Sequence, residues 1–424
     1  MRALQPNDLQ SCNSNVLPRC MSNGFLFRDR IHKMALDRQF VSTVPDRGGL
    51  LRNARRVVVK VGTAVVCDPK ERFDQQRVCT LAGGIAALVK GGRQVVLVSS
   101  GAVTLGAAEM EVHRTRLRDA SITRACAAVG HCTLMQAWAD AFRPHGLTPA
   151  QVLVTEDDFT DLSRYKILRQ TFERLLKLGA VPVVNENDTV TNIWTEQPAV
   201  FRDNDRLAAL VLSKLDADAL VLLSNVDGLL RDPERGAEAG NVVPLVTSLS
   251  SDIRDSARGK SPAGRGGMTA KLEAAEIAMH AGGMVIIANG QTPGILEQVF
   301  QGANLGTLFL PGSRMAGKKR WLAFAATERG QISINTNAGK ALLHGHASLL
   351  ISGVTACKGE FSSGQVISIV DTEGKIIGRG VAECGSQELS RMLASHNGPI
   401  RGVLVRRENF LVLSGKEQSY ARPG

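Results

Sequence analysis

The sequence feature that most constrains the fold is a series of short apolar runs that alternate with stretches of helical periodicity. The runs, rich in Val, Ile and Leu, are Val57–Val61, Gln94–Val98, Gln151–Val154, Val181–Val184, Leu220–Leu223 and Met284–Ala288. The helical stretches are Arg72–Lys90, Ala120–Phe142, Tyr165–Leu178 and Thr269–Ala281. Nearly continuous apolar runs of this length predict strands buried on both faces, and the helices between them predict βαβ units. We therefore predict an α/β fold, a three-layer αβα sandwich with a mainly parallel central sheet.

Two changes in sequence pattern divide the chain of 424 residues into three parts. Residues 1–55 show no sustained periodicity, which predicts a disordered N-terminal leader. Residues 56–325 carry the alternating pattern and predict one large domain. In residues 331–415, short strand-like pieces separated by Gly, Asn and Asp turns predict a small, mostly β domain, with a helix only at Gln387–Ala394. The small, polar and basic segment Pro311–Lys319 is the expected linker.

The net charge of +11 raises the question of nucleic-acid binding, because basic domains bind phosphate backbones. Residues 1–55 carry 9 basic and 4 acidic side chains, residues 56–319 carry 30 and 28, and residues 320–424 carry 12 and 8. The large central part is therefore nearly neutral, and a general attraction to anions explains the excess at the two ends.

Cysteine spacing and apolar run length limit the cellular setting. The 8 cysteines are scattered without a CxxC pair, which argues against a zinc site or a disulfide framework and favours reduced thiols. No apolar run approaches the ~20 residues of a membrane-spanning helix. The leader is basic but also contains Asp8, Asp29, Asp37 and Asp46, whereas transit peptides are poor in acidic residues. We predict a cytoplasmic protein with no membrane association; a mitochondrial location is the alternative.

Polar residues stand at the carboxyl ends of the predicted strands, where open α/β sheets bind their ligands. They are Thr63, Ser99, Asn185, Ser224 and Asn289. Two Asn/Asp clusters lie near this edge: residues 185–188 follow a strand, and residues 203–205 open a helix. Turn and capping chemistry is the alternative explanation, since Asn and Asp suit both roles.

Two lysines and two small-residue segments favour an anionic ligand at the same edge. Lys60 is the one charged residue of the first apolar run. Burying a lysine costs free energy unless it is paired or faces a ligand. The alternative is a lysine at the edge of the sheet, whose ammonium group reaches solvent. Residues 99–103 and the Gly-rich stretch 259–271 each precede a helix, where backbone amides bind phosphates or helix caps form. Lys271 lies in a first helical turn, where a cation opposes the helix dipole and a purely structural role explains it poorly. The chain has neither a P-loop nor the protein-kinase motifs, so phosphotransfer would use another scaffold.

Taken together, the motifs resemble, in order and spacing, those of the glutamate 5-kinase family within the amino-acid-kinase superfamily. They are VVVKVGT (57–63), VSSGAV (98–103), PVVNENDTV (182–190), RDND (202–205), LLSNVDGLL (222–230) and GRGGMTAK (264–271). The resemblance covers about residues 56–325, which it identifies as the catalytic domain. Residues 331–415 resemble the PUA domain appended to many members of this family.

The resemblance implies an ATP-dependent kinase that phosphorylates the side-chain carboxylate of L-glutamate, the first step of proline biosynthesis. It assigns Lys60 and Lys271 to catalysis and to ATP, and Ser100, Gly101, Asp188 and Asn204 to glutamate. The remaining ATP-binding residues would be Ser224, Asn225, Arg265, Gly266, Gly267, Met268, Thr269 and Ala270. Mg²⁺ would arrive on ATP without protein ligands. The chain departs from the family pattern at Ser224-Asn225, where Thr-Asp is usual, and at Arg265, where Thr is common.

Chemistry agrees with this assignment, because the glutamate side chain is ionised at neutral pH and needs no general base. The site must instead bring two anions together and stabilise charge on the transferred phosphoryl group. We expect Asp188 to bind the ammonium group, with Ser100 and Asn204 on the carboxylates. Trp194–Phe201 is expected to form a loop over the acceptor.

The family further implies a homo-oligomer (dimer or tetramer), transfer of the product to a glutamyl-phosphate reductase, and proline inhibition at the glutamate site. Two alternatives remain: a related kinase with another acceptor, and an RNA-associated protein that uses the kinase fold as a scaffold. The PUA-like part has few aromatic residues for base stacking (Phe361, Phe410 and Tyr420), which favours a structural or regulatory role over RNA binding.

Overall fold

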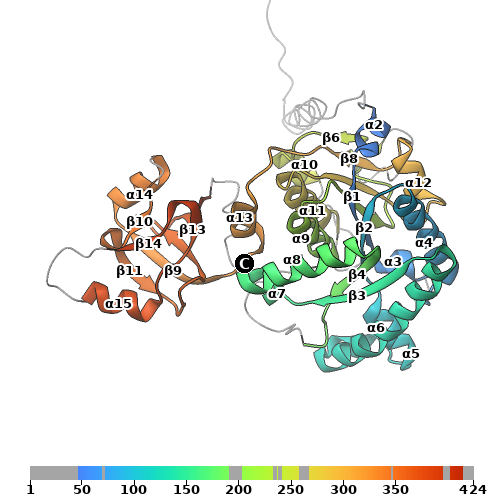
Figure 1. Cartoon of the computed structure of the whole chain (residues 1–424), viewed down its shortest axis with the longest axis horizontal. Helices are drawn as coiled ribbons and strands as arrows, with labels where there is room; N and C mark the ends of the chain where they lie inside the picture. Colours follow the sequence, from blue (N-terminus) through green and yellow to red (C-terminus); the bar gives the residue numbers. More distant parts are fainter. Residues whose placement is uncertain are drawn as a thin grey trace, which may run out of the picture.

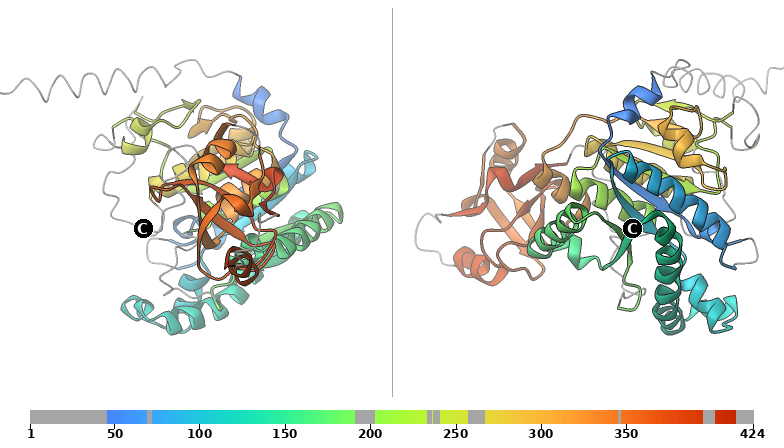
Figure 2. Two further views of the ribbon diagram at one scale, coloured as in Figure 1. Left: turned by 90° about the vertical axis from the view of Figure 1, so that its left-hand side faces the viewer. Right: turned by 45° about the vertical axis from the view of Figure 1, so that its right-hand side comes forward.

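The computed structural model describes residues 46–413 apart from residues 69–71, 191–202, 233–235, 237–240, 257–266, 345–346 and 395–401. A large α/β domain and a small β-rich domain lie side by side, joined near α13 (Figure 1). The right-hand view in Figure 2 again shows the small domain at one end of the large one. No helix in the described part of the chain is long and apolar enough to cross a membrane.

The large domain is built on an eight-stranded sheet with the strand order β3-β4-β2-β1-β5-β7-β8-β6. The sheet is parallel except for the antiparallel pair β7–β8. Its strands are β1 (Arg56–Val61), β2 (Gln94–Ser99), β3 (Thr148–Val154), β4 (Ala180–Glu186), β5 (Ala219–Ser224), β6 (Leu245–Val246), β7 (Met284–Asn289) and β8 (Thr307–Phe309). Each of the six predicted apolar runs lies within a strand.

Helices cover both faces of this sheet, which confirms the predicted three-layer sandwich. One face packs on α4 (Gln75–Lys90), α6 (Ala120–Phe142) and α12 (Ile295–Phe300), and the other packs on α8 (Leu162–Lys177), α9 (Asn204–Leu215) and α11 (Met268–His280). Shorter helices are α3 (Thr63–Val66), α5 (Ala102–Glu109), α7 (Asp157–Thr160), α10 (Ser251–Ser256) and α13 (Gly317–Arg320), with the 3-10 helices η1 (Arg114–Arg118) and η2 (Arg143–His145) and the π-helical η4 (Trp321–Ala325).

The alternation of side chains along β1 determines where its lysine lies. Val57, Val59 and Val61 point into the core formed with α4, α6 and α12, whereas Val58 points into the core formed with α8, α9 and α11. Because side chains alternate with a period of two, Lys60 shares the second face with Val58. The first strand therefore directs the side chain of Lys60 toward α9 and α11.

The prediction of a disordered leader through residue 55 is wrong for residues 47–52, which form the helix α2. Asp46 caps this helix, and Leu51 is fully buried. The guanidinium of Arg47 donates to the Asn304 side chain and to the Leu305 carbonyl, both at 2.9 Å. A helix this short depends on such tertiary contacts, which local periodicity does not reveal. Residues 1–45 lie outside the described residues.

The small domain contains a five-stranded sheet with the order β11-β9-β12-β13-β15 and a separate pair, β10–β14. Its elements are β9 (Glu328–Ile334), α14 (Thr336–His344), β10 (Leu349–Leu350), η5 (Ile351–Gly353), β11 (Val354–Lys358), β12 (Val366–Val370), β13 (Ile376–Val381), α15 (Ser386–Ala394), β14 (Val403–Val405), η6 (Arg407–Asn409) and β15 (Phe410–Val412). The mostly β prediction is confirmed, but α14 shows that Gln387–Ala394 is not the only helical segment. The predicted linker, 311–319, is irregular up to residue 316 and then enters α13.

Helices α5 and α6 approach each other so closely that only glycine fits at two positions. A Cβ atom added to Gly106 would lie 1.7 Å from the Cys126 carbonyl oxygen, and one added to Gly130 would lie 1.8 Å from the Ala102 carbonyl oxygen. The two helices are therefore packed backbone against backbone, and their relative position is fixed.

We expect Gly130→Ala to lower the free energy of unfolding by about 1–3 kcal/mol, because the added methyl group must push α5 and α6 apart. Urea unfolding of the purified chain measures this. Gly83→Ala is the matched control: its added Cβ would meet its nearest neighbour, the His145 ring, at 3.8 Å, so it should be neutral or stabilise the helix by about 0.5–1 kcal/mol. Equal unfolding midpoints for Gly130→Ala and the parent chain would contradict the close packing.

Candidate active site

Three buried charged side chains from three elements meet at the carboxyl-terminal edge of the sheet. Lys60 Nζ of β1 lies 2.6 Å from Asp205 Oδ1, and Lys271 Nζ of α11 lies 2.9 Å from Asp205 Oδ2. The exposed fractions of Lys60, Asp205 and Lys271 are 7%, 1% and 5%. The two predicted catalytic lysines are thus held side by side by one carboxylate, and the group carries a net positive charge.

The start of α9 explains why Asp205 is available for this role. Asp203 is the N-cap of α9, and its side chain accepts hydrogen bonds from the backbone N–H groups of Asp205 and Arg206. The capping role considered for both aspartates therefore holds for Asp203, whereas both carboxylate oxygens of Asp205 face lysines. Asp205 is a residue of the site that the sequence analysis missed.

The pKa values of the two aspartates move in opposite directions. For Asp205, burial raises the pKa, but the charges and hydrogen bonds of Lys60 and Lys271 outweigh burial and hold it below its ordinary value of 3.8. For Asp203, burial and the negative charge of Asp205 raise the pKa. Asp205 is therefore the ionised partner that fixes the two ammonium groups.

A cavity of about 580 Å³ beside this group contains the residues predicted to bind the acceptor. Its wall includes Ser100, Gly101, Asp188 and Asn204, which come from three of the predicted motifs, and it also includes Asn185. Asn204 Nδ2 donates to Ser100 Oγ at 2.7 Å and to Asn185 Oδ1 at 3.0 Å. Asn185 thus orients Asn204 and is a second residue that the sequence analysis did not assign.

The cavity wall has a mixed charge that suits a zwitterion. Arg72 and Arg114 lie on the same wall as Glu186, Asp188 and Asp203. Gly101 has a φ of 112° and directly precedes α5, where a residue with a side chain would be strained. Backbone amides at this helix start are donors for a carboxylate. The side-chain amide of Asn204 becomes a further donor when one of its two N–H groups, which bind Ser100 and Asn185 in this structure, turns to the ligand.

The remaining predicted residues lie at the ends of β5 and at the start of α11. Ser224 is the last residue of β5 and is paired in register with Asn289, the last residue of β7. The Ser224 hydroxyl donates to Asn225 Oδ1 at 3.4 Å. Gly267 is the N-cap of α11, so Met268, Thr269 and Ala270 form its first turn together with Lys271. Arg265, Gly266 and the predicted loop Trp194–Phe201 lie outside the described residues.

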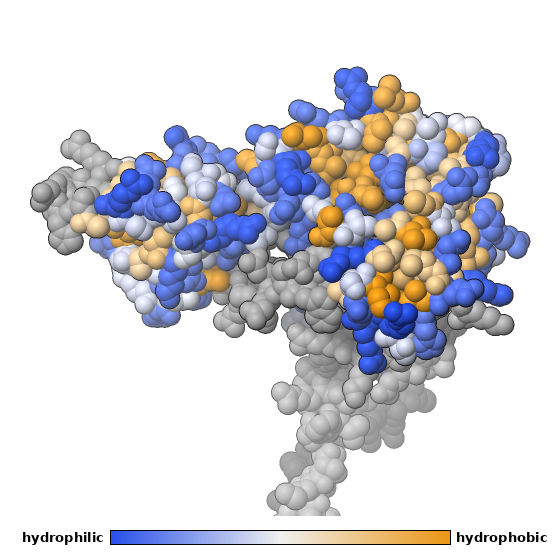
Figure 3. Space-filling model, turned by 90° about the horizontal axis from the view of Figure 1, so that it is seen from below, coloured by the Kyte–Doolittle hydropathy of each residue, from blue (hydrophilic) through white to orange (hydrophobic). Residues whose placement is uncertain are grey.

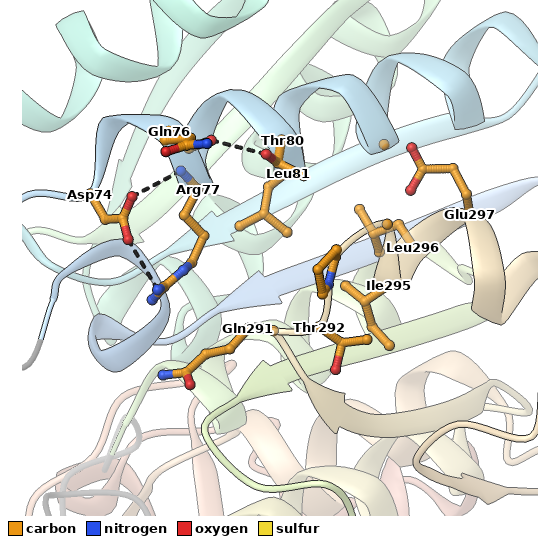
Figure 4. Close-up of a pocket in the computed structure, with 14 residues that line it drawn as sticks. Asp74, Gln76, Arg77, Thr80, Leu81, Gln291, Thr292, Ile295, Leu296 and Glu297 are labelled. Atoms are coloured by element: carbon orange, nitrogen blue, oxygen red, sulfur yellow. Dashed lines mark hydrogen bonds and ion pairs between the residues drawn. The ribbon is translucent and has the colours of Figure 1, made fainter.

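A second cavity, of about 290 Å³, lies between α4 and the segment 290–297 (Figure 4). In it Arg77 pairs with Asp74 at 3.0 Å, and none of the predicted site residues lines it. The larger cavity is therefore the candidate acceptor site.

Comparisons with known proteins agree with this geometry. A model of the amino acid kinase family matches residues 55–289, more than half of the chain, and a model of the PUA domain matches residues 330–403. A glutamate 5-kinase of Myxococcus xanthus is 41% identical over 374 residues, which cover 86% of this chain and 97% of that relative.

Two further relatives carry the same name. A glutamate 5-kinase of Syntrophotalea carbinolica is 37% identical, covering 86% of this chain and 99% of the relative, and one of Thermus thermophilus is 39% identical, covering 84% and 94%. These alignments extend over both domains and over nearly the full length of each relative. The chain therefore belongs to the amino acid kinase family and, within it, to the glutamate 5-kinases.

Proposed function

We propose that this chain transfers the γ-phosphate of ATP to the side-chain carboxylate of L-glutamate, giving γ-glutamyl phosphate and ADP. The observation that carries the proposal is the Lys60–Asp205–Lys271 group beside a cavity of mixed charge. Family membership supports the same reaction, because the relatives that cover the whole chain are named glutamate 5-kinases.

The two lysines serve the phosphoryl group, and their fixed position is the main contribution of the chain to catalysis. A positive charge that is already in place stabilises the charge developing on the transferred group without reorganising in the reaction. Lys60 comes from the sheet and Lys271 from the start of α11, so together they face the phosphates from two elements. Asp205 keeps both ammonium groups at one point before ATP binds.

Mg²⁺ would come to the site on ATP. Lys60 and Lys271 occupy both oxygens of Asp205, so this carboxylate is not an open metal ligand. Among the described residues, no group of three or more His, Cys, Asp or Glu side chains is arranged to hold a metal ion. Bound to the ATP phosphates, Mg²⁺ would neutralise part of their charge and orient them.

The acceptor cavity would hold glutamate through the charged side chains and the hydrogen-bond donors of its wall. Asp188 would bind the ammonium group, and Ser100 and Gly101 would donate to the carboxylates. Asn204 would join them by turning to a carboxylate the N–H group that donates to Ser100 in this structure. Asn185 holds the Asn204 amide in place at 3.0 Å. The side-chain carboxylate of glutamate then points toward Lys60 and Lys271, where it attacks the γ-phosphorus as an already ionised nucleophile.

Asp188→Asn is expected to raise KM for glutamate about 30-fold or more while kcat changes less. Removing one member of a charge pair costs roughly 2 kcal/mol or more, and the amide no longer attracts the ammonium group. Steady-state kinetics with varied glutamate at saturating ATP measures the split. A KM equal to that of the parent chain would remove Asp188 from the acceptor site.

Acceptor specificity distinguishes a glutamate 5-kinase from a related kinase that phosphorylates another acceptor. We expect ATP-dependent ADP release in a coupled assay with L-glutamate, and little release with aspartate, which is one methylene shorter, or with glutarate, which lacks the ammonium group. Preferential turnover of another amino acid would favour the alternative of a sister kinase.

The small domain would act as a structural or regulatory unit. Phe361 and Phe410 are buried, with exposed fractions of 5% and 7%, so they are not available to stack on bases. Arg379 of β13 pairs with Glu328 at the start of β9 and donates to the Leu322 and Ala323 carbonyls of η4 at 3.3 Å. These contacts anchor the sheet to the segment that leaves the large domain. Salt-sensitive RNA binding that requires residues 331–424 would contradict this role.

Residues 56–325 form the catalytic domain and residues 331–415 the PUA domain of a cytoplasmic enzyme that passes its product to a glutamyl-phosphate reductase. Seen from below, the large domain exposes apolar areas among hydrophilic ones (Figure 3). Contiguous apolar surface is typical of subunit contacts and supports a homo-oligomer, which light scattering would detect.

A further inference from the structure

A histidine that the proposed mechanism does not use lies behind the carboxylate assigned to the substrate ammonium. His131 belongs to α6, its exposed fraction is 4%, and its Nε2 atom lies 4.0 Å from Asp188 Oδ2. Among the described residues, Nε2 has no hydrogen-bond partner. The ring also forms a hydrogen bond with the backbone of Glu186. One buried ring thus contacts the segment 186–188 at two points.

The packing of α6 keeps this ring in place. His131 follows Gly130 directly, and Gly130 packs against the backbone of α5 so closely that no Cβ would fit. Helix α5 begins immediately after Ser100 and Gly101, which line the acceptor cavity. The close packing of α5 on α6 therefore fixes the distance between two parts of the site. One part is the set of carboxylate donors at the start of α5, and the other is His131 on α6.

We propose that His131 is a positioning residue for Asp188, and that a proton on His131 competes with the substrate ammonium for this carboxylate. The inference rests on the proposed function, because it requires Asp188 to bind the ammonium group of glutamate. Neutral His131 leaves the full negative charge of Asp188 to the substrate. Protonated His131 forms an ion pair with Asp188 and weakens glutamate binding.

The direction of the pH effect follows from the surroundings of the ring. Burial lowers the pKa of His131 below its ordinary value of 6.5, and the hydrogen bond with the Glu186 backbone opposes this only in part. His131 is therefore neutral at pH 7.5, and it gains its proton as the pH falls below 6.5. Glutamate keeps its ammonium group throughout this range, and its side-chain carboxylate, with a pKa of about 4.3, stays ionised.

Other titratable groups lie on the elements around His131, but among the described residues its one ion pair is with Asp188. The charged or titratable residues of these elements are Glu186 at the end of β4 and Asp188 after it, Glu109 on α5, Arg77, Cys79 and Lys90 on α4, Arg114, Arg116 and Arg118 on η1, Arg143 and His145 on η2, and Arg124, Cys126, Cys132 and Asp140 on α6. Strand β3, which also contacts α6, carries no charged residue.

The test compares the pH dependence of KM and kcat in the full chain and in His131→Gln. For the parent chain, we expect KM for glutamate to rise as the pH is lowered from 7.5 through the pKa of His131, with a smaller change in kcat, since one proton competing with the ligand changes KM up to about tenfold per pH unit. Glutamine keeps a hydrogen-bonding side chain without a titratable group, so KM of His131→Gln should stay nearly constant. The control His344→Gln alters an exposed histidine of the small domain and should retain the pH dependence of the parent chain.

A second measurement does not depend on a variant. Nuclear magnetic resonance titration of the histidine rings should show that saturating glutamate lowers the pKa of His131, because the bound ammonium occupies Asp188. Glutarate, which has no ammonium group, should leave that pKa unchanged or raise it. An unchanged pKa with glutamate, or an equal rise of KM in His131→Gln and in the parent chain, would overturn the inference. Absence of glutamate turnover at every pH would overturn the proposed function instead.

Discussion

Replacing Asp205 with asparagine is expected to cause the largest combined loss of activity and stability of any single substitution in the site. The change removes the negative charge between two lysines that are almost fully buried, so Lys60 and Lys271 are left next to each other without compensation. Breaking a buried ion pair from one side costs about 3–5 kcal/mol of stability. Because both lysines also lose their fixed position, we expect kcat to fall by about 100- to 1000-fold.

The stability part of this prediction has a matched control two residues away. Asp203→Asn makes the same chemical change at the N-cap of α9, but asparagine caps helices as well as aspartate does. We therefore expect a loss of no more than about 1 kcal/mol for Asp203→Asn in denaturant unfolding. Equal losses for the two variants would mean that the ion pairs of Asp205 contribute little.

The pH dependence of unfolding gives an independent check on Asp205. Because the lysines hold its pKa below 3.8 in the folded chain, its contribution to stability is complete above 3.8 and is lost as the pH falls through the lower folded value. The parent chain should therefore lose more stability than Asp205→Asn when the pH is lowered below 3.8.

Lys271→Met is expected to lower kcat by about 100-fold or more and to leave KM for glutamate within a few-fold of the parent value. Methionine has a similar volume and fits the buried position, but it offers no charge to the transferred phosphoryl group. Asp205 would still be paired with Lys60 at 2.6 Å, so the fold should be less affected than in Asp205→Asn.

Rapid-quench measurement of a single turnover separates the chemical step from product release in this variant. Lys90→Met is the control, since Lys90 is an exposed lysine at the end of α4 and should behave like the parent chain. If Lys271→Met has the single-turnover rate of the parent chain, Lys271 does not stabilise the transition state of phosphoryl transfer.

Much of the fold could be predicted because buried parallel strands have a strong local signature. Five of the six apolar runs are largely buried, whereas Gln151–Val154 lies in the edge strand β3 and is only partly buried. The alternation of the runs with helices leaves few other arrangements. The elements that the sequence did not predict are short, such as α2 and α14. Their apolar residues are too few to show periodicity, and contacts with distant residues stabilise them.

The sequence predicted which residues line the site better than it predicted the contacts between their side chains. Ser100, Asp188 and Asn204 lie on one cavity wall, as their positions at strand and helix ends predicted. Asp205 was missed because an Asp-Asn-Asp sequence at a helix start is fully explained by capping. Its role depends on Lys60 and Lys271, which are far from it in the sequence and meet it only in the folded chain.

The most direct test of the central claim is the formation of γ-glutamyl hydroxamate by the purified chain. Hydroxylamine traps an acyl phosphate, so the assay reports phosphorylation of a carboxylate and not merely ATP hydrolysis. We predict hydroxamate formation that requires ATP, Mg²⁺ and L-glutamate together and falls by at least about 100-fold in Lys271→Met. ADP release without hydroxamate, or hydroxamate formation that Lys271→Met and Asp205→Asn leave unchanged, would contradict the account.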